Sequence, residues 1–329
     1  MRVMLSSDHC YPSQNGVSSG RHPREYPSGS GHLLHDLLAK GLAEAGHEVL
    51  YYLPRGAAGP LPPGVRLIGE PDPTADIYHN AAFRDENVIA FADSRGMPWV
   101  TTCHVDRSTR QERGWKVGRN WIFVSKSLAR SHGSTRYVLN GIDPADYLYS
   151  ESKSDYLLFM TALERAWEKG LDTAFTVSRR TGVRLVVAGT AGGYSIIRGI
   201  AKACAENNAD YIGDVRGREK AELFAGAQAL LFPTKLNEGF GLVLVEALMS
   251  GTPVICSANG ACPEVVSPEA GFVCRVLDEY VAAVSRLGEI RSSECRRFAL
   301  ERYHYHRMTA GYLREYEAEI LESRTGTCA

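Results

Sequence analysis

The chain has 329 residues, of which 44% are hydrophobic and 23% charged, and its formal net charge at pH 7 is -1. This length predicts two domains of ordinary globular composition, and the near-zero charge gives no general attraction to nucleic acid or anionic membranes. No apolar run approaches the roughly 20 residues that span a bilayer, and the first residues enter a strand pattern without the apolar core of a signal peptide. We therefore expect a cytoplasmic protein without a transmembrane segment.

The eight cysteines show neither a C-x-x-C pair nor the spacing of zinc ligands. Several lie in apolar strand patterns, where a thiol behaves as a small hydrophobe. We expect reduced thiols, as is usual in the cytoplasm.

Strand and helix patterns alternate along the first half of the chain. Apolar runs predict strands at residues 2–7, 48–53, 65–68, 76–79, 99–104 and 121–125. Periodic apolar positions predict helices at residues 32–45, 83–95 and 127–132. A polar loop rich in turn residues fills residues 8–31, and its length hints at function, although glycine-serine stretches are usually linkers.

The second half repeats this alternation after a polar stretch, residues 146–155, that predicts the domain boundary. The expected strands are residues 156–160, 183–188, 211–213, 229–233, 253–256 and 270–274. The expected helices are residues 171–180, 195–207, 219–225, 242–249, 277–290, 295–303 and 307–323. Strands separated by helices predict parallel sheets with right-handed crossovers.

The most informative stretch is residues 237–255, which read N-E-G-F-G-L-V-L-V-E-A-L-M-S-G-T-P-V-I. A turn at Gly239 and Gly241 follows a buried strand and leads into a helix, whose free N–H groups and dipole suit a phosphate. Glu246 lies within that apolar helix, where a carboxylate needs a partner such as a ribose diol. The alternative is an ordinary strand-turn-helix whose glutamates, including Glu238, face water.

Two histidines, His79 and His104, stand at the carboxyl ends of predicted strands, where α/β sheets bind their ligands. Each is either a site residue or a structural histidine. Basic residues then recur at every third position, beginning with Arg107 and Arg110. They predict either a solvated basic face or arginine forks that hold an anionic acceptor.

The spacing Glu238-x7-Glu246, with Gly-Phe-Gly after the first glutamate and A-L-M-S-G-T-P-V-I after the second, resembles the signature of retaining GT-B glycosyltransferases of family GT4. The short bacterial, avilamycin-type subgroup is the most similar. P-E-V-V at residues 263–266 resembles the sequence that follows in that family. Further matching segments are residues 41–49, 76–79, 100–104, 140–143 and 168–172.

The resemblance implies an α/β fold of two Rossmann-like parallel-sheet domains facing a cleft. Residues 1–148 would bind the acceptor and residues 149–305 the nucleotide-sugar donor. A terminal helix at residues 306–329 would pack back on the first domain.

By the same resemblance each site residue has an expected role. The expected catalytic residues are Glu238, His104 and Lys169. The expected donor-binding residues are Glu246, Gly239, Phe240, Gly241, Leu242, Arg165, Gly29 and Gly31. The expected acceptor-binding residues are His79, Arg107 and Arg110. One departure concerns the family's arginine five residues before the lysine: Glu164 occupies that position, and Arg165 follows it.

The implied reaction is retaining transfer of a hexose from a nucleotide-sugar, UDP-linked in preference to GDP-mannose, to a hydroxyl of a small polar or anionic acceptor. No D-x-D triplet offers a carboxylate pair to a divalent metal, so we expect no metal and no cofactor beyond the donor. The charge on the leaving nucleotide would be met by Lys169 and backbone N–H groups. The alternatives are a nucleotide-sugar 2-epimerase-like enzyme and a non-catalytic sugar-nucleotide-binding relative.

Overall fold

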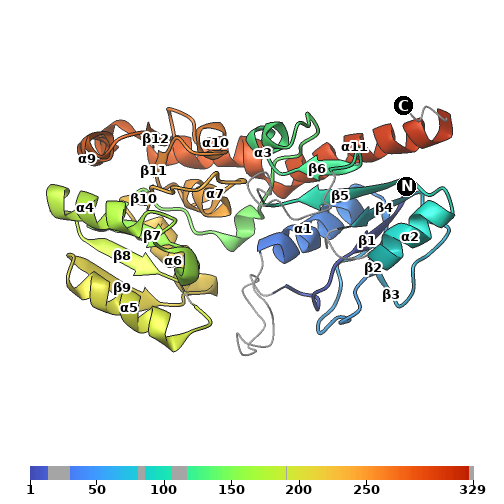
Figure 1. Cartoon of the computed structure of the whole chain (residues 1–329), viewed down its shortest axis with the longest axis horizontal. Coiled ribbons are helices and arrows are strands. Elements are labelled where there is room, and N and C mark those ends of the chain that lie inside the picture. Colours follow the sequence, from blue (N-terminus) through green and yellow to red (C-terminus); the bar gives the residue numbers. More distant parts are fainter. Residues whose placement is uncertain (14–29, 81–85, 106–116, 190, 326–329) are drawn as a thin grey trace. The chain divides into compact units, whose positions relative to one another are not determined.

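The computed structural model describes residues 1–13, 30–80, 86–105, 117–189 and 191–325. The chain divides into two compact units (Figure 1): unit 1 comprises Met1–Asp143 and Tyr303–Ala329, and unit 2 comprises Pro144–Arg302. Among the described helices, none is both long enough and apolar enough to cross a bilayer.

The first boundary between the units lies between Asp143 and Pro144, whereas the sequence analysis placed it after residue 148. The reason is that residues just after Asp143 are already tied into unit 2. The Tyr147 hydroxyl donates to Glu246, and the Ser150 N–H donates to the Ser250 carbonyl. The second boundary precedes Tyr303 rather than following residue 305.

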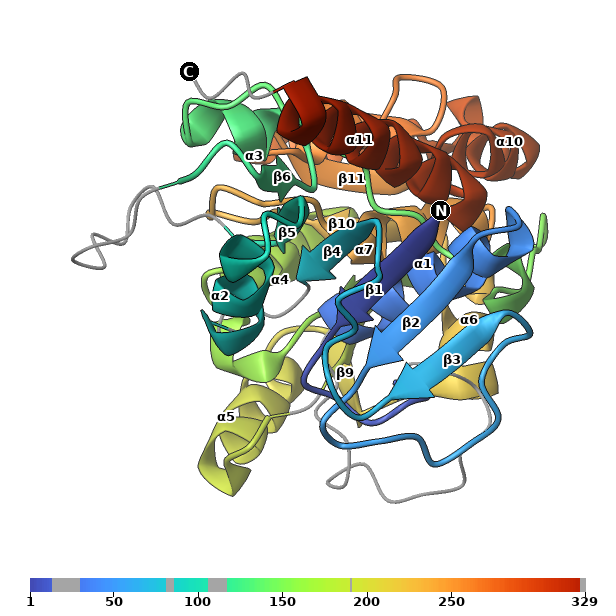
Figure 2. The ribbon, with the colours of Figure 1, turned by 90° about the vertical axis from the view of Figure 1, so that its right-hand side faces the viewer.

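Unit 1 contains a six-stranded parallel sheet. Its strands are β1 (Arg2–Ser6), β2 (Glu48–Tyr52), β3 (Val65–Ile68), β4 (Ile77–Asn80), β5 (Trp99–Cys103) and β6 (Trp121–Phe123). Its helices are α1 (Ser30–Glu44), α2 (Glu86–Ser94), α3 (Lys126–Ser131) and α11 (Tyr305–Thr325). The strands lie side by side in the order β3-β2-β1-β4-β5-β6 (Figure 2).

Helices cover both faces of this sheet, and neighbouring residues of a strand therefore face different layers. Tyr78 packs with Met4 and with Val88 of α2, whereas the next residue, His79, contacts α1 and α11. α1 and α11 pack closely, since a Cβ added at Gly41 would lie 2.1 Å from the Thr309 hydroxyl oxygen. Burial on both faces explains why the middle of β1, Val3-Met4-Leu5, reads as a continuous apolar run.

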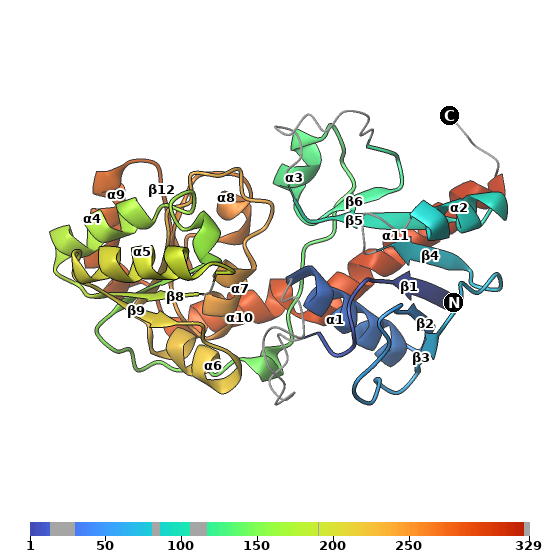
Figure 3. The same ribbon diagram turned by 60° about the horizontal axis from the view of Figure 1, so that its bottom comes forward.

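Unit 2 contains a second six-stranded parallel sheet (Figure 3). Its strands are β7 (Leu157–Met160), β8 (Leu185–Ala188), β9 (Ala209–Gly213), β10 (Ala229–Phe232), β11 (Val254–Ser257) and β12 (Gly271–Cys274). Its α-helices are α4 (Leu171–Thr181), α5 (Tyr194–Ala205), α6 (Gly217–Gly226), α7 (Leu242–Met249), α8 (Cys262–Val265), α9 (Leu277–Ser285) and α10 (Ser292–Tyr303). Short 3-10 turns are η2 (Pro144–Asp146), η3 (Leu163–Arg165) and η4 (Leu287–Glu289).

Both sheets have the same doubly wound order, because unit 2 runs β12-β11-β10-β7-β8-β9. In each, the chain starts at a central strand, adds two strands on one side and then adds three on the other. The switch points therefore lie between β1 and β4 in unit 1 and between β7 and β10 in unit 2. Open α/β sheets bind ligands at the carboxyl ends of strands at such points. The predicted fold class, two Rossmann-like parallel-sheet domains, is confirmed.

Two differences from the expected elements are small. The predicted helix at residues 277–290 is divided into α9 and η4, with a break at Arg286. The P-E-V-V segment forms a short helix, α8, with Pro263 in its first turn, where the missing N–H of proline costs nothing.

Candidate functional site

The loops that follow β7 and β10 meet at the switch point of unit 2. Gly170, at the end of the first loop, has φ +87°, and a Cβ there would lie 2.1 Å from the Pro233 carbonyl oxygen of the second loop. Only glycine permits both this left-handed conformation and this close approach. The contact positions Lys169, the residue before it, beside the glycine turn of the central stretch.

Lys169 and Glu238 form an ion pair across these two loops. Their side chains are only 12% and 14% exposed, and the lysine ammonium also lies 5.1 Å from the centre of the Phe232 ring. Each charge neutralises the other, so neither is left buried and unpaired, which would be costly. The structure thus brings together two predicted catalytic residues that are 69 positions apart in sequence.

The second predicted glutamate, Glu246, is buried within α7 and does not face water. Its Oε1 atom accepts hydrogen bonds from the Tyr147 hydroxyl at 2.8 Å and from the Lys220 ammonium at 2.6 Å. Gly241 immediately precedes the helix and has φ +85°, and a Cβ there would lie 2.9 Å from Leu244. Lys220 and Tyr147 are partners that the sequence did not predict.

A third loop, after β11, holds the backbone of Glu238. Gly260 has φ +59°, and a Cβ there would lie 2.2 Å from the Glu238 nitrogen, while the Ala261 N–H donates to the Glu238 carbonyl at 2.8 Å. The Asn259 side chain donates to the Thr234 carbonyl at 2.7 Å. The dipeptide Asn259-Gly260 is a turn signal that could have identified this loop from sequence.

The remaining donor-binding predictions differ in their surroundings. Phe240 is buried in the protein interior, and Leu242 is the first residue of α7. Arg165 is 52% exposed and pairs with Glu168 at 3.1 Å. Glu164, at the position of the family's arginine, accepts a hydrogen bond from the Gly192 N–H at 2.7 Å. Among the described residues, no arginine takes part in the Lys169–Glu238 ion pair in the place of the family's arginine.

In unit 1, His79 is fully buried at the end of β4. Its Nδ1 atom lies 2.6 Å from the Tyr316 hydroxyl, and its Nε2 atom lies 2.7 Å from the Thr102 hydroxyl. Burial, and then the nearby His104, lower the pKa of His79 to about 3. Both ring nitrogens are engaged inside unit 1, so the geometry favours the structural interpretation of this residue over acceptor binding.

His104 follows β5 and differs from His79 in one respect. Its Nε2 atom is buried and has no hydrogen-bond partner among the described residues. The ring lies beside the first turn of α1, where a Cβ added at Gly31 would be 3.7 Å away. Burial, and then the nearby His32, lower the pKa of His104 to about 4, so the ring is neutral at pH 7. The predictions for Gly29, Arg107 and Arg110 lie outside the described residues.

Three further histidines, which the sequence reasoning missed, lie near His104 and His79. His35 on α1 makes edge contacts with His79 and His104, with ring centroids 5.1 and 6.3 Å apart. His9 stacks on His32 at 4.7 Å and pairs with Asp36 at 2.8 Å. The spacing of His32, His35 and Asp36 on one predicted helix was the available signal.

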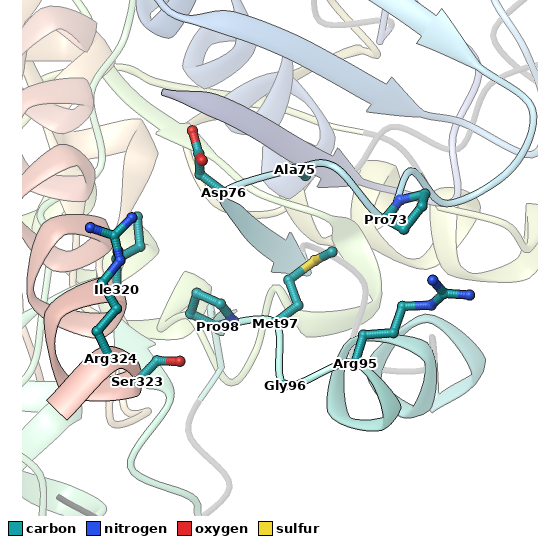
Figure 4. Close-up of a pocket in the computed structure, with 10 residues that line it drawn as sticks. All are labelled: Pro73, Ala75, Asp76, Arg95, Gly96, Met97, Pro98, Ile320, Ser323 and Arg324. Atoms are coloured by element: carbon teal, nitrogen blue, oxygen red, sulfur yellow. The ribbon is translucent and has the colours of Figure 1, made fainter. Parts of the chain in front are cut away.

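A pocket of about 290 Å³ opens elsewhere in unit 1 (Figure 4). It is lined by Pro73, Ala75, Asp76, Arg95, Gly96, Met97, Pro98, Ile320, Ser323 and Arg324. These residues precede β4 and β5 or end α11, so the pocket lies at the amino ends of the strands. That edge is opposite to the one where α/β sheets bind ligands. Within the described part of the chain, no cluster of three or more histidine, cysteine or acidic side chains could hold a metal ion.

Comparisons with known proteins agree with this geometry. Residues 149–301 match the family "Glycosyl transferases group 1". The MMP alpha-(1->4)-mannosyltransferase of Mycolicibacterium hassiacum is 37% identical over 121 residues, which cover 33% of this chain and 28% of that protein. The chain thus spans less than a third of the length of that curated relative.

Solved structures match over almost the whole chain. AviGT4, a glycosyltransferase involved in avilamycin A biosynthesis, has a TM-score of 0.72 at 22% identity, with 97% of this chain and 98% of that chain covered. Anabaena HepE in complex with UDP-glucose has a TM-score of 0.68 at 16% identity, with 97% and 100% covered. Residues 149–301, nearly all of unit 2, match the group 1 glycosyl transferases, and the whole chain has the GT-B fold of these solved structures.

Proposed function

We propose that the protein is a retaining, metal-independent glycosyltransferase. It would move a hexose from a nucleotide-sugar to a hydroxyl of a small polar or anionic acceptor, with no cofactor beyond the donor. The observation that carries this proposal is the presence of two lysine–glutamate ion pairs, Lys169–Glu238 and Lys220–Glu246, on the loops and helices at the switch point of unit 2. Retention is inferred from the likeness of the central stretch to retaining GT4 enzymes.

Donor binding would replace partners within these pairs. The diphosphate would take Lys169 from Glu238, and the N–H groups at the start of α7 would donate to phosphate oxygens. The ribose diol would donate to Glu246, whose Oε2 atom receives no hydrogen bond from the described residues. A UDP-sugar is favoured because HepE binds UDP-glucose, and GDP-mannose comes next because a curated relative of Corynebacterium glutamicum is a GDP-mannose-dependent mannosyltransferase.

In the chemical step the C–O bond between the hexose and the diphosphate breaks, and negative charge develops on the leaving nucleotide. Lys169 would stabilise that charge, with the backbone N–H groups around Gly241. The acceptor hydroxyl would attack from the side that the nucleotide leaves, forming the new glycosidic C–O bond and passing its proton to the leaving diphosphate. Glu238, freed from Lys169, would bind hydroxyls of the hexose, and His104 of unit 1 would lie near the sugar. No protein nucleophile is needed in this scheme.

One observation favours a second candidate. Glu164 occupies the position of the family's arginine, and the side chain of Arg165 is directed to Glu168. A relative that binds sugar nucleotides without transfer would show the same loss of positive charge. An epimerase-like enzyme remains the other alternative and would interconvert the donor without any acceptor.

The test is the melting temperature of the full chain with UDP, GDP, UDP-glucose and GDP-mannose, in EDTA and then in magnesium. A ligand that binds the native state raises the free energy of unfolding by RT ln(1 + [L]/Kd). We expect a rise with one nucleotide family in EDTA. That rise should be lost in Glu246→Gln and kept in the control Glu219→Gln, an exposed glutamate on α6. No rise under either condition would overturn the donor site.

Product analysis separates the three functions. A glycoside formed only with an acceptor, with the anomeric configuration of the donor, indicates a retaining transferase. A changed sugar in the absence of acceptor indicates an epimerase, and binding without turnover indicates the non-catalytic relative.

A further inference from the structure

The pocket at the amino edge of the unit 1 sheet is a feature that the proposed transfer does not use. Its volume of about 290 Å³ is close to the lower end of the range of roughly 300–1,000 Å³ that ligand pockets occupy. Three segments that are distant in sequence line it: the turn before β4, the turn between α2 and β5, and the last turns of α11 (Figure 4). None of the described residues that line it has a role in the proposed transfer.

Hydrogen bonds within unit 1 hold two walls of this pocket in place. The Asp76 N–H donates to the Arg2 carbonyl at 2.8 Å, and the Asp76 carboxylate accepts from the Arg2 N–H at 2.7 Å. α2 ends in a turn in which Gly96 has φ +62°, and the Met97 N–H donates to the Ala92 carbonyl at 3.0 Å. The pocket is therefore preformed, as ligand pockets usually are.

Arg95 provides a site for an anionic group at one side of the pocket. Its guanidinium carbon lies 4.6 Å from the centre of the Phe91 ring, so the aromatic ring covers one face of the guanidinium. The N–H groups point outward in the plane of the guanidinium, and a contact through its face leaves them available. Such a planar set of donors binds a phosphate or a carboxylate through two parallel hydrogen bonds.

The opposite side of the pocket combines a donor, an acceptor and a hydroxyl. Figure 4 shows Asp76, Ser323 and Arg324 on this side, away from Arg95. A carboxylate accepts, a guanidinium donates and a serine hydroxyl does both, which matches the hydroxyls of a ligand, since these also donate and accept. The carboxylate of Asp76 repels anions, so the anionic group of a ligand is expected at Arg95 and its hydroxyls at Asp76.

Apolar atoms separate these two sides. Met97 and Pro98 lie between them in Figure 4, and a ring with C–H groups would pack against these residues. The pocket thus offers an anion site, an apolar middle and a hydroxyl site in that order.

We propose that this pocket binds a small hydroxylated anion, a sugar phosphate or a sugar acid, with its anionic group on Arg95 and its hydroxyls on Asp76, Ser323 and Arg324. The site is additional to the donor site of unit 2, and its existence does not depend on the proposed transfer.

The first experiment is isothermal titration calorimetry of the full chain. The probes are glucose 6-phosphate and glucuronate, with glucose and inorganic phosphate as the two halves of the expected ligand. We expect one of the hexose anions to bind with a Kd at least about tenfold lower than that of either half. The tighter of the two shows whether a phosphate or a carboxylate is preferred. Equal Kd values for inorganic phosphate and glucose 6-phosphate would mean that the pocket holds an adventitious ion only, and no binding of either hexose anion would also overturn the proposal.

The second experiment locates the bound probe. Arg95→Gln should raise the Kd of the tighter hexose anion by about tenfold or more. Ser323→Trp, at an exposed position of α11, should fill the pocket and abolish binding, whereas Ser323→Ala should change the Kd less than about threefold. The matched control is Arg130→Gln, at an exposed arginine in the last turn of α3, which should leave the Kd unchanged.

Lys169→Gln separates this site from the donor site. The Kd of the hexose anion should be the same in this variant as in the original chain. A loss of binding in Lys169→Gln, or an unchanged Kd in Arg95→Gln, would place the probe outside the pocket and overturn the inference. Nucleotide binding at Glu246, followed by melting temperature, reports on the proposed function, so the two proposals fail independently.

Discussion

The carboxyl edges of the two sheets contrast in charge, although the strand order is the same. In unit 2 both predicted glutamates are paired with lysines, Lys169 with Glu238 and Lys220 with Glu246. In unit 1 the corresponding edge carries the neutral imidazoles of His35, His79 and His104, and two of these have a nitrogen without a partner among the described residues. A buried charge is costly unless it is paired, and these lysines and glutamates of unit 2 pair with each other. A neutral nitrogen that is left unpaired costs less than an unpaired charge.

This difference separates the expected behaviour of the two sites. A charged donor must exchange one ion pair for another in unit 2, so removal of a charge there should have large effects on activity. In unit 1 the loss of a neutral hydrogen bond should have a moderate effect on activity. The stability of unit 1 should depend on pH, because protonation of the buried histidine rings is costly.

The largest expected effect comes from Lys169→Gln. Loss of the cation that would meet the developing negative charge should lower kcat/KM by about 10²–10³-fold. The double variant Lys169→Gln/Glu238→Gln removes the unpaired carboxylate and should remain at least as impaired, because Glu238 would also bind the hexose. The control is Lys235→Gln, an exposed lysine that pairs with Asp172. Steady-state kinetics with the productive donor measures all three, and recovery of activity in the double variant would contradict a role for the lysine charge.

Gly170→Ala should have the next largest effect, on stability. Its φ of +87° is unfavourable for alanine, and its Cβ would lie 2.1 Å from the Pro233 carbonyl oxygen. We expect the free energy of unfolding to fall by about 3 kcal/mol. Gly182→Ala is the matched control, since its φ is +74° but no described atom lies within 4 Å of the added Cβ. It should cost only about 1 kcal/mol. Urea unfolding curves measure both, and equal losses would show that the loop contact contributes nothing.

The next effect in size is a loss of stability at acid pH, which we expect from the buried ring of His79 in unit 1. The pKa of His79 is about 3 in the folded protein and about 6.5 when unfolded, so below pH 6.5 the unfolded state takes up the proton first. The stabilisation is complete above pH 6.5 and is lost progressively as the pH falls toward 3. At pH 5 the loss from this ring should be about 2 kcal/mol.

His79→Gln removes the titrating ring, and its free energy of unfolding should therefore fall less between pH 7 and pH 5 than that of the original chain. Urea unfolding at both pH values measures the difference. An unchanged pH dependence would show that this ring does not resist protonation.

The smallest effect is expected from Arg165→Ala. The guanidinium is half-exposed and pairs with Glu168, and exposed pairs contribute little to stability. We expect kcat/KM and the nucleotide Kd to change less than about threefold. A loss above about tenfold would mean that Arg165 turns to the diphosphate in the bound state and replaces the family's arginine. Isothermal titration calorimetry with the productive nucleotide measures the Kd.

The sequence predicted the fold class and most strand and helix cores because periodicity is a local property. The alternation of apolar strands and amphipathic helices required parallel sheets, and α7 has the expected bounds. Glycine turns and the spacing of Glu238 and Glu246 likewise identified the central stretch. The position of Glu164 was visible in sequence as a departure, and the structure shows which backbone group it contacts.

Which of these side chains pair with each other was decided only by the tertiary structure. Lys169 and Glu238 are 69 residues apart, Lys220 and Glu246 are 26 apart, and His79 and Tyr316 are 237 apart. A strand pattern does not specify its neighbours, and the doubly wound order places β7 next to β10 although two strands separate them in sequence. For the same reason the burial of His35 was not predicted, because its ring contacts, His79 and His104, are distant from it in sequence. The residue types that could bind a ligand were set locally, and the contacts that pair some of them and leave others unpaired arose from strand order and helix packing.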